Sequence, residues 1–192
     1  MNFLITSARN EVDITQMFIK GEKISDELIK QYETVLPDKL IAMWKEYGYG
    51  ELLDGYLRII NPNDYQQLIC DTYFRGNTSV PVLVTAFGDV ITYENEGYMG
   101  LVKYKNGSFN ILSKGIPLFL AAIKDDHYLN EYFQLSMYDS AVKRLGKLGH
   151  DECYGFVPLL GLGGKEDVSN LKIVKTREHL DLITQLLGGI GM

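Results

Sequence analysis

Residues 153–164 form an uncharged run, Cys-Tyr-Gly-Phe-Val-Pro-Leu-Leu-Gly-Leu-Gly-Gly, that lies between two polar segments. The apolar side chains of such a run call for burial. A long core strand is nevertheless unfavourable, because Pro158 lacks a backbone donor and the four glycines have no side chain to pack. The run therefore predicts a short buried strand followed by a turn, with positive φ angles at Gly161, Gly163 and Gly164.

A glycine followed by Lys165 also gives the run a superficial likeness to a phosphate-binding loop. That motif requires an earlier glycine at a fixed spacing and a Ser or Thr directly after the lysine. The chain has no glycine at the earlier position, and Glu166 follows the lysine, where its carboxylate would repel a phosphate. We therefore expect the glycines to be structural and not to bind a nucleotide.

The composition is that of an ordinary globular protein, since 46% of the 192 residues are hydrophobic and 23% are charged. No apolar run approaches the ~18 residues that a membrane span needs, and the first ten residues lack the charged start of a secretion signal. Cys70 and Cys153 are the only cysteines, which is typical of a reducing compartment. We expect a cytoplasmic protein that does not bind a membrane.

Negative charge is concentrated in the middle of the chain. Between Glu46 and Glu96 there are eight acidic and two basic residues, which accounts for the whole net charge of −6, because acids and bases balance elsewhere. A block of one sign can steer a basic partner toward the protein. It argues against nucleic acid as a ligand, because phosphates require positive charge. The alternative is an acidic face that only increases solubility.

Helix signals dominate the first third of the chain. Ser25 is expected to cap a helix over residues 26–35, with Leu28, Ile29, Tyr32 and Val35 on its apolar face. Pro37 can begin a second helix that ends at Gly48. The Asn61-Pro62 pair is typical of a cap and the first residue of a third.

The middle of the chain predicts an antiparallel meander. Four β-prone runs are separated by short turns, and Asn106-Gly107 is the strongest hairpin signal, because a type I′ turn needs positive φ at both central residues. The expected strands cover residues 80–87, 90–93, 98–104 and 109–112.

Helices resume after the meander. The segment 116–123 is apolar on nearly every side and is expected to be buried, and a helix capped by Ser136 is expected to end at Gly149. A strand over 171–174 and a helix over 177–187 complete the chain. The polar stretch Asp125–Asn130 is the expected junction between a part covering residues 1–124 and a part covering 125–192. The fold class predicted is α+β, with N-terminal helices packed on a central antiparallel β-meander and a smaller helical or αβ C-terminal part packed against it.

No group of residues in the sequence requires an enzyme. The cluster His150-Asp151-Glu152-Cys153 lacks the further ligands that a zinc site would need. Cys153 could act as a nucleophile only if a histidine such as His179 lay beside it, and a cysteine before an apolar strand is more often a small buried residue. We predict no catalytic, cofactor or metal-binding residue.

Tyrosines accompany the acidic block. The chain has thirteen, and many lie within or beside the block. Tyrosine suits interfaces because it buries a large area with few torsions and keeps a polar tip, although most tyrosines in a sheet simply pack its surface. The combination predicts a surface that binds a basic protein. The residues expected to form it are Glu46, Glu51, Asp54, Asp89, Tyr93, Glu94, Glu96 and Tyr98.

Both ends of the chain resemble known families. The run from Tyr154 to Gly164, the stretch 171–174 and Glu178-His179-Leu180 resemble the C-terminal domain of bacterial type VI secretion DNase-immunity proteins. The stretches 36–40, 44–50 and 60–62, with sequences Leu-Pro-Asp-Lys-Leu, Trp-Lys-Glu-Tyr-Gly-Tyr-Gly and Ile-Asn-Pro, are similar to the GAD-like domain that precedes it. The Trp-Lys-Glu-Tyr-Gly piece is also similar to the broader SUKH superfamily of immunity proteins.

The resemblance implies a GAD-like domain over residues 1–124 and an immunity-type domain over 125–192. It further implies a protein that binds a cognate toxin, which we expect to be a basic nuclease, and neutralises it without chemistry by covering its active or functional surface. The acidic residues could imitate the phosphates of the toxin's substrate. Two alternatives stay open: a small Cys-dependent hydrolase that uses Cys153, and a ligand-binding regulatory module.

Overall fold

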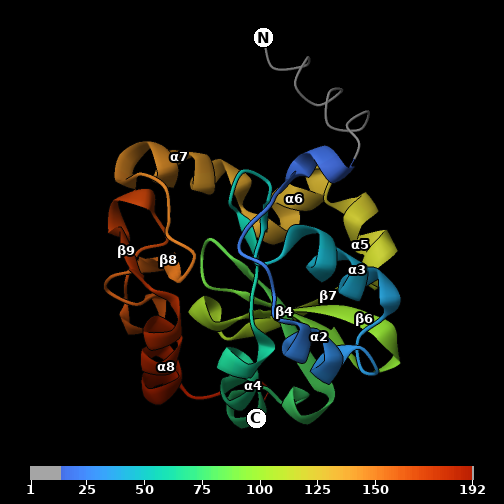
Figure 1. Ribbon diagram of the computed structural model, residues 1–192. Coiled ribbons are helices and arrows are strands. Elements are labelled where there is room, and N and C mark those ends of the chain that lie inside the picture. Colours follow the sequence, from blue (N-terminus) through green and yellow to red (C-terminus); the bar gives the residue numbers. More distant parts are fainter. Residues whose placement is uncertain (1–13, 192) are drawn as a thin grey trace.

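The protein, seen in a computed structural model that describes residues 14–191, has an α+β fold built on a seven-stranded antiparallel sheet (Figure 1). The strands lie in the sheet in chain order, so each pairs with the next. They are β1 (Phe18–Ile19), β2 (Glu51–Leu52), β3 (Leu57–Ile59), β4 (Ser79–Thr85), β5 (Val90–Glu94), β6 (Tyr98–Lys103) and β7 (Ser108–Lys114). A second sheet pairs β8 (Glu152–Phe156) with β9 (Leu171–Lys175). The predicted α+β class and the meander are confirmed.

The described residues contain seven α-helices. These are α2 (Asp26–Tyr32), α3 (Asp38–Tyr47), α4 (Pro62–Thr72), α5 (Ile116–Ala122), α6 (Asp126–Phe133), α7 (Leu135–Leu145) and α8 (Thr176–Leu187). The expected caps of two of them are confirmed: Ser25 accepts a hydrogen bond from the amide of Leu28, and Asn61 accepts one from the amide of Asn63. The first helix is shorter than predicted, so Val35 lies beyond it and is 54% exposed.

Two hydrophobic cores lie on opposite faces of the sheet, because successive residues of a strand point to opposite sides. One face is covered by α4 and α8, and the other by α2, α3, α5, α6 and α7. The second sheet joins the larger core through Tyr154, Phe156 and Leu171. The strands contribute Val84, Val90 and Val102 to the smaller core and Leu83, Ile91 and Leu101 to the larger one.

The turn between β6 and β7 differs from the expected type I′ hairpin. Residues Tyr104–Asn106 form a 3-10 turn, and only Gly107 has a left-handed backbone, with φ 64°. The additional turn residue allows the Lys105 side chain to turn inward, where it lies 3.3 Å from the carboxylate of Asp89. The glycine was predicted for its positive φ, but the turn type was wrong.

The helices after the meander also depart from the sequence pattern. In α5, Leu118 is 60% exposed, so the expectation that this helix is buried on nearly every side is wrong. The stretch Asp125–Asn130, expected to be a junction, is mostly part of α6, which is capped by Asp125. The following helix α7 ends at Leu145, where Gly146 (φ 87°) caps it, and does not continue to Gly149.

A buried arginine connects the large sheet with the C-terminal part of the chain. Arg58, in β3, is 1% exposed, and its guanidinium donates hydrogen bonds to four backbone carbonyl oxygens. These belong to Gly149 at 2.7 Å, His150 at 3.2 Å, Glu152, and Thr85 at 3.3 Å. Burial lowers the pKa of Arg58, but an arginine stays charged over the physiological range. The guanidinium therefore holds the segment that leads into β8 against the large sheet.

Other hydrogen bonds cross the same boundary. The hydroxyl of Tyr56 donates to the carbonyl of Phe133, and the hydroxyl of Tyr138 donates to the carbonyl of Asp54 at 2.8 Å. In Figure 1, β8, β9 and α8 lie together along one side of the large sheet, and α6 and α7 lie above it. The C-terminal part is thus packed against the meander, as predicted.

We predict that Arg58→Met lowers the free energy of unfolding by about 3 kcal/mol, because it leaves buried carbonyl groups without donors. The measurement is urea unfolding followed by circular dichroism. The control is Lys143→Met, on the exposed surface of α7, where we expect a change within about 0.5 kcal/mol. Equal effects of the two substitutions would contradict the role assigned to Arg58.

Candidate functional site

The residues expected to bind a partner do not form one surface. The register of β4 separates them, because Thr85 at its end pairs with Leu57 of β3, whereas Ser79 at its start pairs with Glu94 of β5. Asp54 precedes β3 and so lies near one end of β4, and Glu96 follows β5 and lies near the other. The block of negative charge in the sequence is therefore divided in the fold.

The first group of acids lies around the edge strand β1. Glu51 is in β2, which pairs with β1, and Glu46 forms an ion pair with Lys20 at 2.6 Å. Asp54 is exposed on a turn in which Leu53 and Asp54 both have left-handed backbones, with φ 54° and 56°. The hydrogen bond that its carbonyl accepts from Tyr138 fixes this turn. Glu46, Glu51 and Asp54 thus reach the surface, and of the three only Glu46 forms an ion pair within the described residues.

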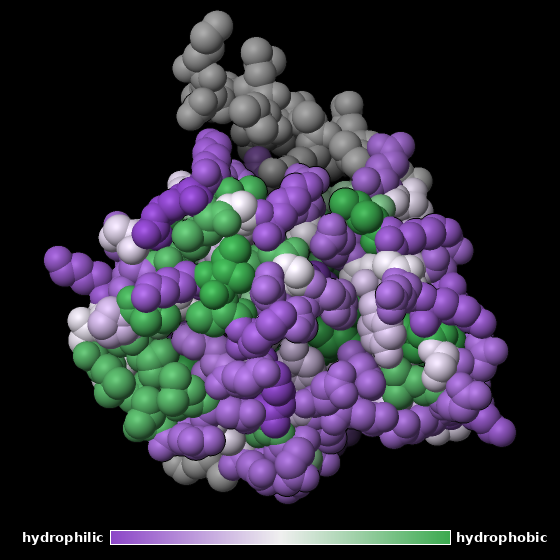
Figure 2. All heavy atoms as spheres, turned by 60° about the vertical axis from the view of Figure 1, so that its left-hand side comes forward, coloured by the Kyte–Doolittle hydropathy of each residue, from purple (hydrophilic) through white to green (hydrophobic). Residues whose placement is uncertain are grey.

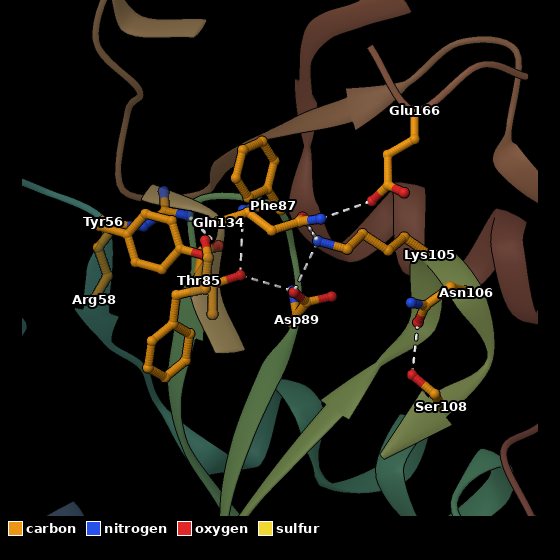
Figure 3. A network of polar contacts seen from close by, with 11 residues as sticks. Tyr56, Arg58, Thr85, Phe87, Asp89, Lys105, Asn106, Ser108, Gln134 and Glu166 are labelled. Atoms are coloured by element: carbon orange, nitrogen blue, oxygen red, sulfur yellow. Dashed lines mark hydrogen bonds and ion pairs between the residues drawn. The ribbon is translucent and has the colours of Figure 1, made fainter. Parts of the chain in front are cut away.

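Asp89 lies in the interior, which corrects the expectation that it contacts a partner. It is 1% exposed, and its carboxylate faces the ammonium of Lys105, which is itself 8% exposed (Figure 3). The Lys105 ammonium also donates to Gln134 at 3.0 Å, and the Gln134 amide donates to Glu166 at 2.9 Å. The Lys105 ammonium lies 4.8 Å from the centre of the Phe87 ring. These contacts connect the sheet, the α6–α7 turn and the loop before β9.

The electrostatics of Asp89 follow from this burial. Neither carboxylate oxygen accepts a hydrogen bond of good geometry within the described part of the chain, although Lys105 is close. Loss of water raises the pKa of Asp89, and the positive charge of Lys105 opposes that rise only in part. The Asp89–Lys105 pair therefore makes its contacts in the interior and presents no charge to a partner.

Glu94 is also buried, so its expected contact with a partner is corrected as well. It is 3% exposed, and its carboxylate accepts hydrogen bonds from Tyr73 at 2.7 Å, Thr92 at 3.1 Å and Arg75 at 2.8 Å. A side chain on Gly100 would collide with this carboxylate, since a Cβ there would lie 2.1 Å from the Glu94 Oε1. Burial raises the pKa of Tyr73, and its bond to Glu94 adds to that rise.

The remaining three expected residues lie at the turn between β5 and β6 or beside it. Glu96 is exposed and has a left-handed backbone (φ 62°), whereas Tyr93 and Tyr98 are half-buried. The ammonium of Lys114 lies 5.4 Å from the centre of the Tyr98 ring. This second group carries one free surface acid, so it is a weaker candidate for charge-driven binding than the group around β1.

The environment of Cys153 argues against nucleophilic chemistry. The residue is fully buried in β8, and burial raises the pKa of its thiol to about 12. A nucleophilic cysteine needs a lowered pKa and access to substrate. His179 packs against Gly155, two residues further along the strand, and burial lowers the pKa of its imidazole. The thiol is therefore a neutral core group at physiological pH.

The other side chains of the cluster His150-Asp151-Glu152-Cys153 do not converge on one site. His150 lies with its Nε2 3.0 Å from the carbonyl oxygen of Ile59, and Asp151 forms an ion pair with Lys175 at 2.7 Å. Between residues 14 and 191, no three His, Cys, Asp or Glu side chains are placed to hold a metal ion. Over the same residues, no helix has the length and apolar character needed to cross a membrane.

The uncharged run is part strand and part surface loop. Only Gly163 has a positive φ (85°), so the expectation for Gly161 and Gly164 is wrong. Those two glycines are needed for space: a Cβ on Gly161 would lie 2.4 Å from the Leu187 side chain, and one on Gly164 would lie 2.1 Å from the carbonyl oxygen of Pro158. The predicted short buried strand is confirmed in β8.

The loop that follows β8 brings apolar side chains to the surface. Leu162 is 58% exposed, and Leu182, Leu186 and Leu187 of α8 are also exposed. Figure 2 turns this side of the molecule forward and shows hydrophobic side chains gathered between hydrophilic ones. The run thus contributes to the surface as well as to the core.

Comparisons with known proteins find both of the families that the two ends of the chain resemble. The model of the GAD-like domain matches residues 8–111, and the model described as T6SS immunity protein Tdi1, C-terminal, matches residues 113–187. Neither matched model is that of the SUKH superfamily. The more distant resemblance to SUKH proteins therefore remains a prediction. A search of the curated proteins finds no match.

A solved structure shares the fold. The crystal structure of Atu4351 from Agrobacterium tumefaciens superposes with a TM-score of 0.74 and 18% sequence identity. The alignment covers 88% of this chain and 86% of that one. At this identity the likeness concerns the fold alone, which extends over nearly the whole of both chains.

We predict that a disulfide reagent modifies Cys70 in the folded protein at pH 8 and modifies Cys153 only after unfolding. Cys70 is partly exposed, whereas the thiol of Cys153 is buried and protonated at this pH. The measurement is the time course with which the reagent releases its own thiol, recorded with and without denaturant. A control variant, Cys70→Ala, should show no fast reaction. Rapid modification of Cys153 in that variant would contradict the assigned environment.

We also predict a pH-dependent difference in stability between the wild type and Asp89→Asn. The raised pKa means that folded Asp89 holds its proton at a pH where the unfolded carboxyl, with a pKa of about 3.9, has lost it. Its contribution to stability is therefore largest below that pH and is lost as the pH rises through the folded pKa. The free energy of unfolding of the wild type minus that of the variant should fall as the pH rises above about 4.

The control is Asp71→Asn, an exposed carboxylate in α4. Denaturant unfolding at a series of pH values supplies both comparisons. A difference for Asp89→Asn that stays constant or rises with pH would show that the carboxylate is stabilised in its ionised form.

Proposed function

Because the chain belongs to the family that joins a GAD-like domain to the C-terminal domain of the T6SS immunity protein Tdi1, we propose that it binds a cognate antibacterial toxin and neutralises it. The two consecutive family matches carry this proposal, since together they extend over residues 8–187 with a gap of a single residue. They support an immunity role. We further propose that the toxin is a secreted, basic nuclease.

The proposed mechanism is steric and electrostatic. The protein covers the active or functional surface of the toxin, and accessible carboxylates attract it. Glu46, Glu51, Asp54 and Glu96 remain at the surface, and a nuclease that binds phosphates needs positive charge. Carboxylates placed on or beside a rigid sheet can occupy the positions that substrate phosphates would otherwise take. Such an inhibitor acts in the cytoplasm of the cell it protects, which agrees with its two free thiols.

The alternative of a Cys-dependent hydrolase has less support. A hydrolase that inactivated the toxin would need an accessible thiolate, and the pKa of about 12 for Cys153 opposes one. A binding protein needs no such group. The two functions also differ in stoichiometry, because an enzyme acts on many toxin molecules and an inhibitor occupies one.

We predict that co-expression with the toxin encoded by the adjacent open reading frame restores growth. With purified proteins, toxin activity should fall linearly as the protein is added and reach zero at molar equivalence. A nuclease assay on plasmid DNA measures this titration if the toxin is a nuclease. Cys153→Ala should keep both growth rescue and the equivalence point.

Two outcomes would contradict the proposal. The first is loss of rescue in Cys153→Ala although circular dichroism shows a folded protein. The second is complete inactivation by far less than one equivalent, which would indicate turnover. Failure of the wild type to bind or to rescue would remove this toxin as the partner and with it the immunity role proposed for the pair.

A further inference from the structure

A groove flanks the edge strand β1. It consists of two cavities of about 230 and 380 Å³ that meet at Ile19. The first is lined by Gln16, Met17, Ile19, Leu53, Asp54, Leu135, Tyr138 and Asp139, and the second by Ile19, Lys20, Gly21, Glu22, Tyr49, Gly50, Glu51 and His150. Each cavity is large compared with the roughly 30 Å³ of a water molecule, so each can receive a side chain.

The two family regions build the groove together. The strand and turn residues come from the GAD-like region, whereas Leu135, Tyr138, Asp139 and His150 come from the region that matches the immunity C-terminal model. Binding sites occur preferentially where two such units meet. The hydrogen bond from Tyr138 to the Asp54 carbonyl and those from Arg58 to residues 149–152 hold the walls in place. The groove is therefore preformed.

The groove carries negative charge that the protein does not neutralise. Glu22, Glu51, Asp54 and Asp139 line it, and within residues 14–191 none of them forms an ion pair. The lysine at the groove, Lys20, is already paired with Glu46 at 2.6 Å. Uncompensated carboxylates that converge on one groove favour a positively charged occupant.

The groove contains apolar side chains and lies at the edge of the sheet. Ile19 is 50% exposed, and Met17 and Leu135 are half-buried beside it. Strand β1 is the first in the strand order, so among residues 14–191 no further strand pairs with its outer side. An edge strand can pair with an extended segment of another protein, with specificity from side chains that enter neighbouring pockets.

We propose that this groove is the docking site for an extended segment of the toxin in which lysine or arginine alternates with apolar residues. The apolar side chains cover Ile19 and Leu135, and the basic side chains reach Glu51, Asp54 and Asp139. This inference rests on the proposed function for the identity of the partner. It goes beyond that function by assigning the surface and the chemistry of the bound segment.

The test compares two triple variants of the full chain. The groove variant is Glu51→Gln, Asp54→Asn, Asp139→Asn, which keeps side-chain size, and asparagine tolerates the left-handed backbone at position 54. The matched control removes the same charge from exposed acids outside the groove: Glu33→Gln, Asp71→Asn, Glu178→Gln. Circular dichroism verifies that both variants fold.

The first measurement is the association rate with the toxin at low salt. We expect the groove variant to associate about tenfold more slowly, because electrostatic steering changes on-rates by about 10 to 1000-fold, and the control to stay within about twofold. The salt dependence should also weaken in the groove variant alone. A groove variant that behaves like the control while the wild type binds would overturn the inference and leave the immunity role intact.

The second measurement does not depend on the toxin. A capped peptide that alternates lysine with leucine is titrated into the isotope-labelled protein, and amide shifts are followed by NMR. We expect the largest shifts at Ile19, Gly21, Glu51 and Asp54, and their loss in the groove variant and at high salt. Shifts elsewhere, no shifts, or a dimer of the wild type that the substitution Ile19→Ser dissociates would overturn the proposed occupant.

Discussion

The guanidinium of Arg58 is a buried cation whose partners are backbone carbonyl groups rather than a carboxylate. Removing a charge from water is costly unless hydrogen bonds compensate for it, and here four carbonyl dipoles do so. Three of them belong to Gly149, His150 and Glu152, that is, to the segment that leads into β8 and to its first residue. The Arg58 side chain in β3 therefore helps to fix the position of the second sheet against the first, together with the shared core and the backbone bond from the Tyr154 amide to the Ala86 carbonyl.

Two further charged pairs act in the same way on a smaller scale. Asp89 with Lys105, both buried, holds the β6–β7 turn, and the buried Glu94 with Arg75, whose side chain is 42% exposed, holds the segment after α4. Breaking a buried pair is more costly than forming it is favourable, because the remaining charge loses its partner. These pairs specify which segments meet. They also place Asp89 and Glu94 in the interior, so these two acids do not add to the surface charge. The charge available for binding is consequently less than the sequence total suggests.

Local signals in the sequence predicted most of the fold, because caps, turns and alternating strands depend on nearby residues. The caps Ser25 and Asn61 are examples. The site was harder to predict. Charge density along the chain could not show that Asp89 and Glu94 face inward, since that depends on long-range pairing with Lys105 and Arg75. The roles of Arg58 and Asp139 were also missed. A lone arginine inside the β-prone stretch 56–60 was the one available signal for Arg58.

Rigidity and charge are connected in this fold. An inhibitor that replaces a substrate must hold its carboxylates in fixed positions, because each side chain ordered on binding costs conformational entropy. The left-handed turn at Leu53 and Asp54, fixed by Tyr138, places the backbone that carries one carboxylate before any partner arrives. Since Tyr138 belongs to α7 and Asp54 to the turn before β3, that placement exists only when both parts of the chain are assembled. The conformation of this turn thus depends on contacts between the two parts of the chain.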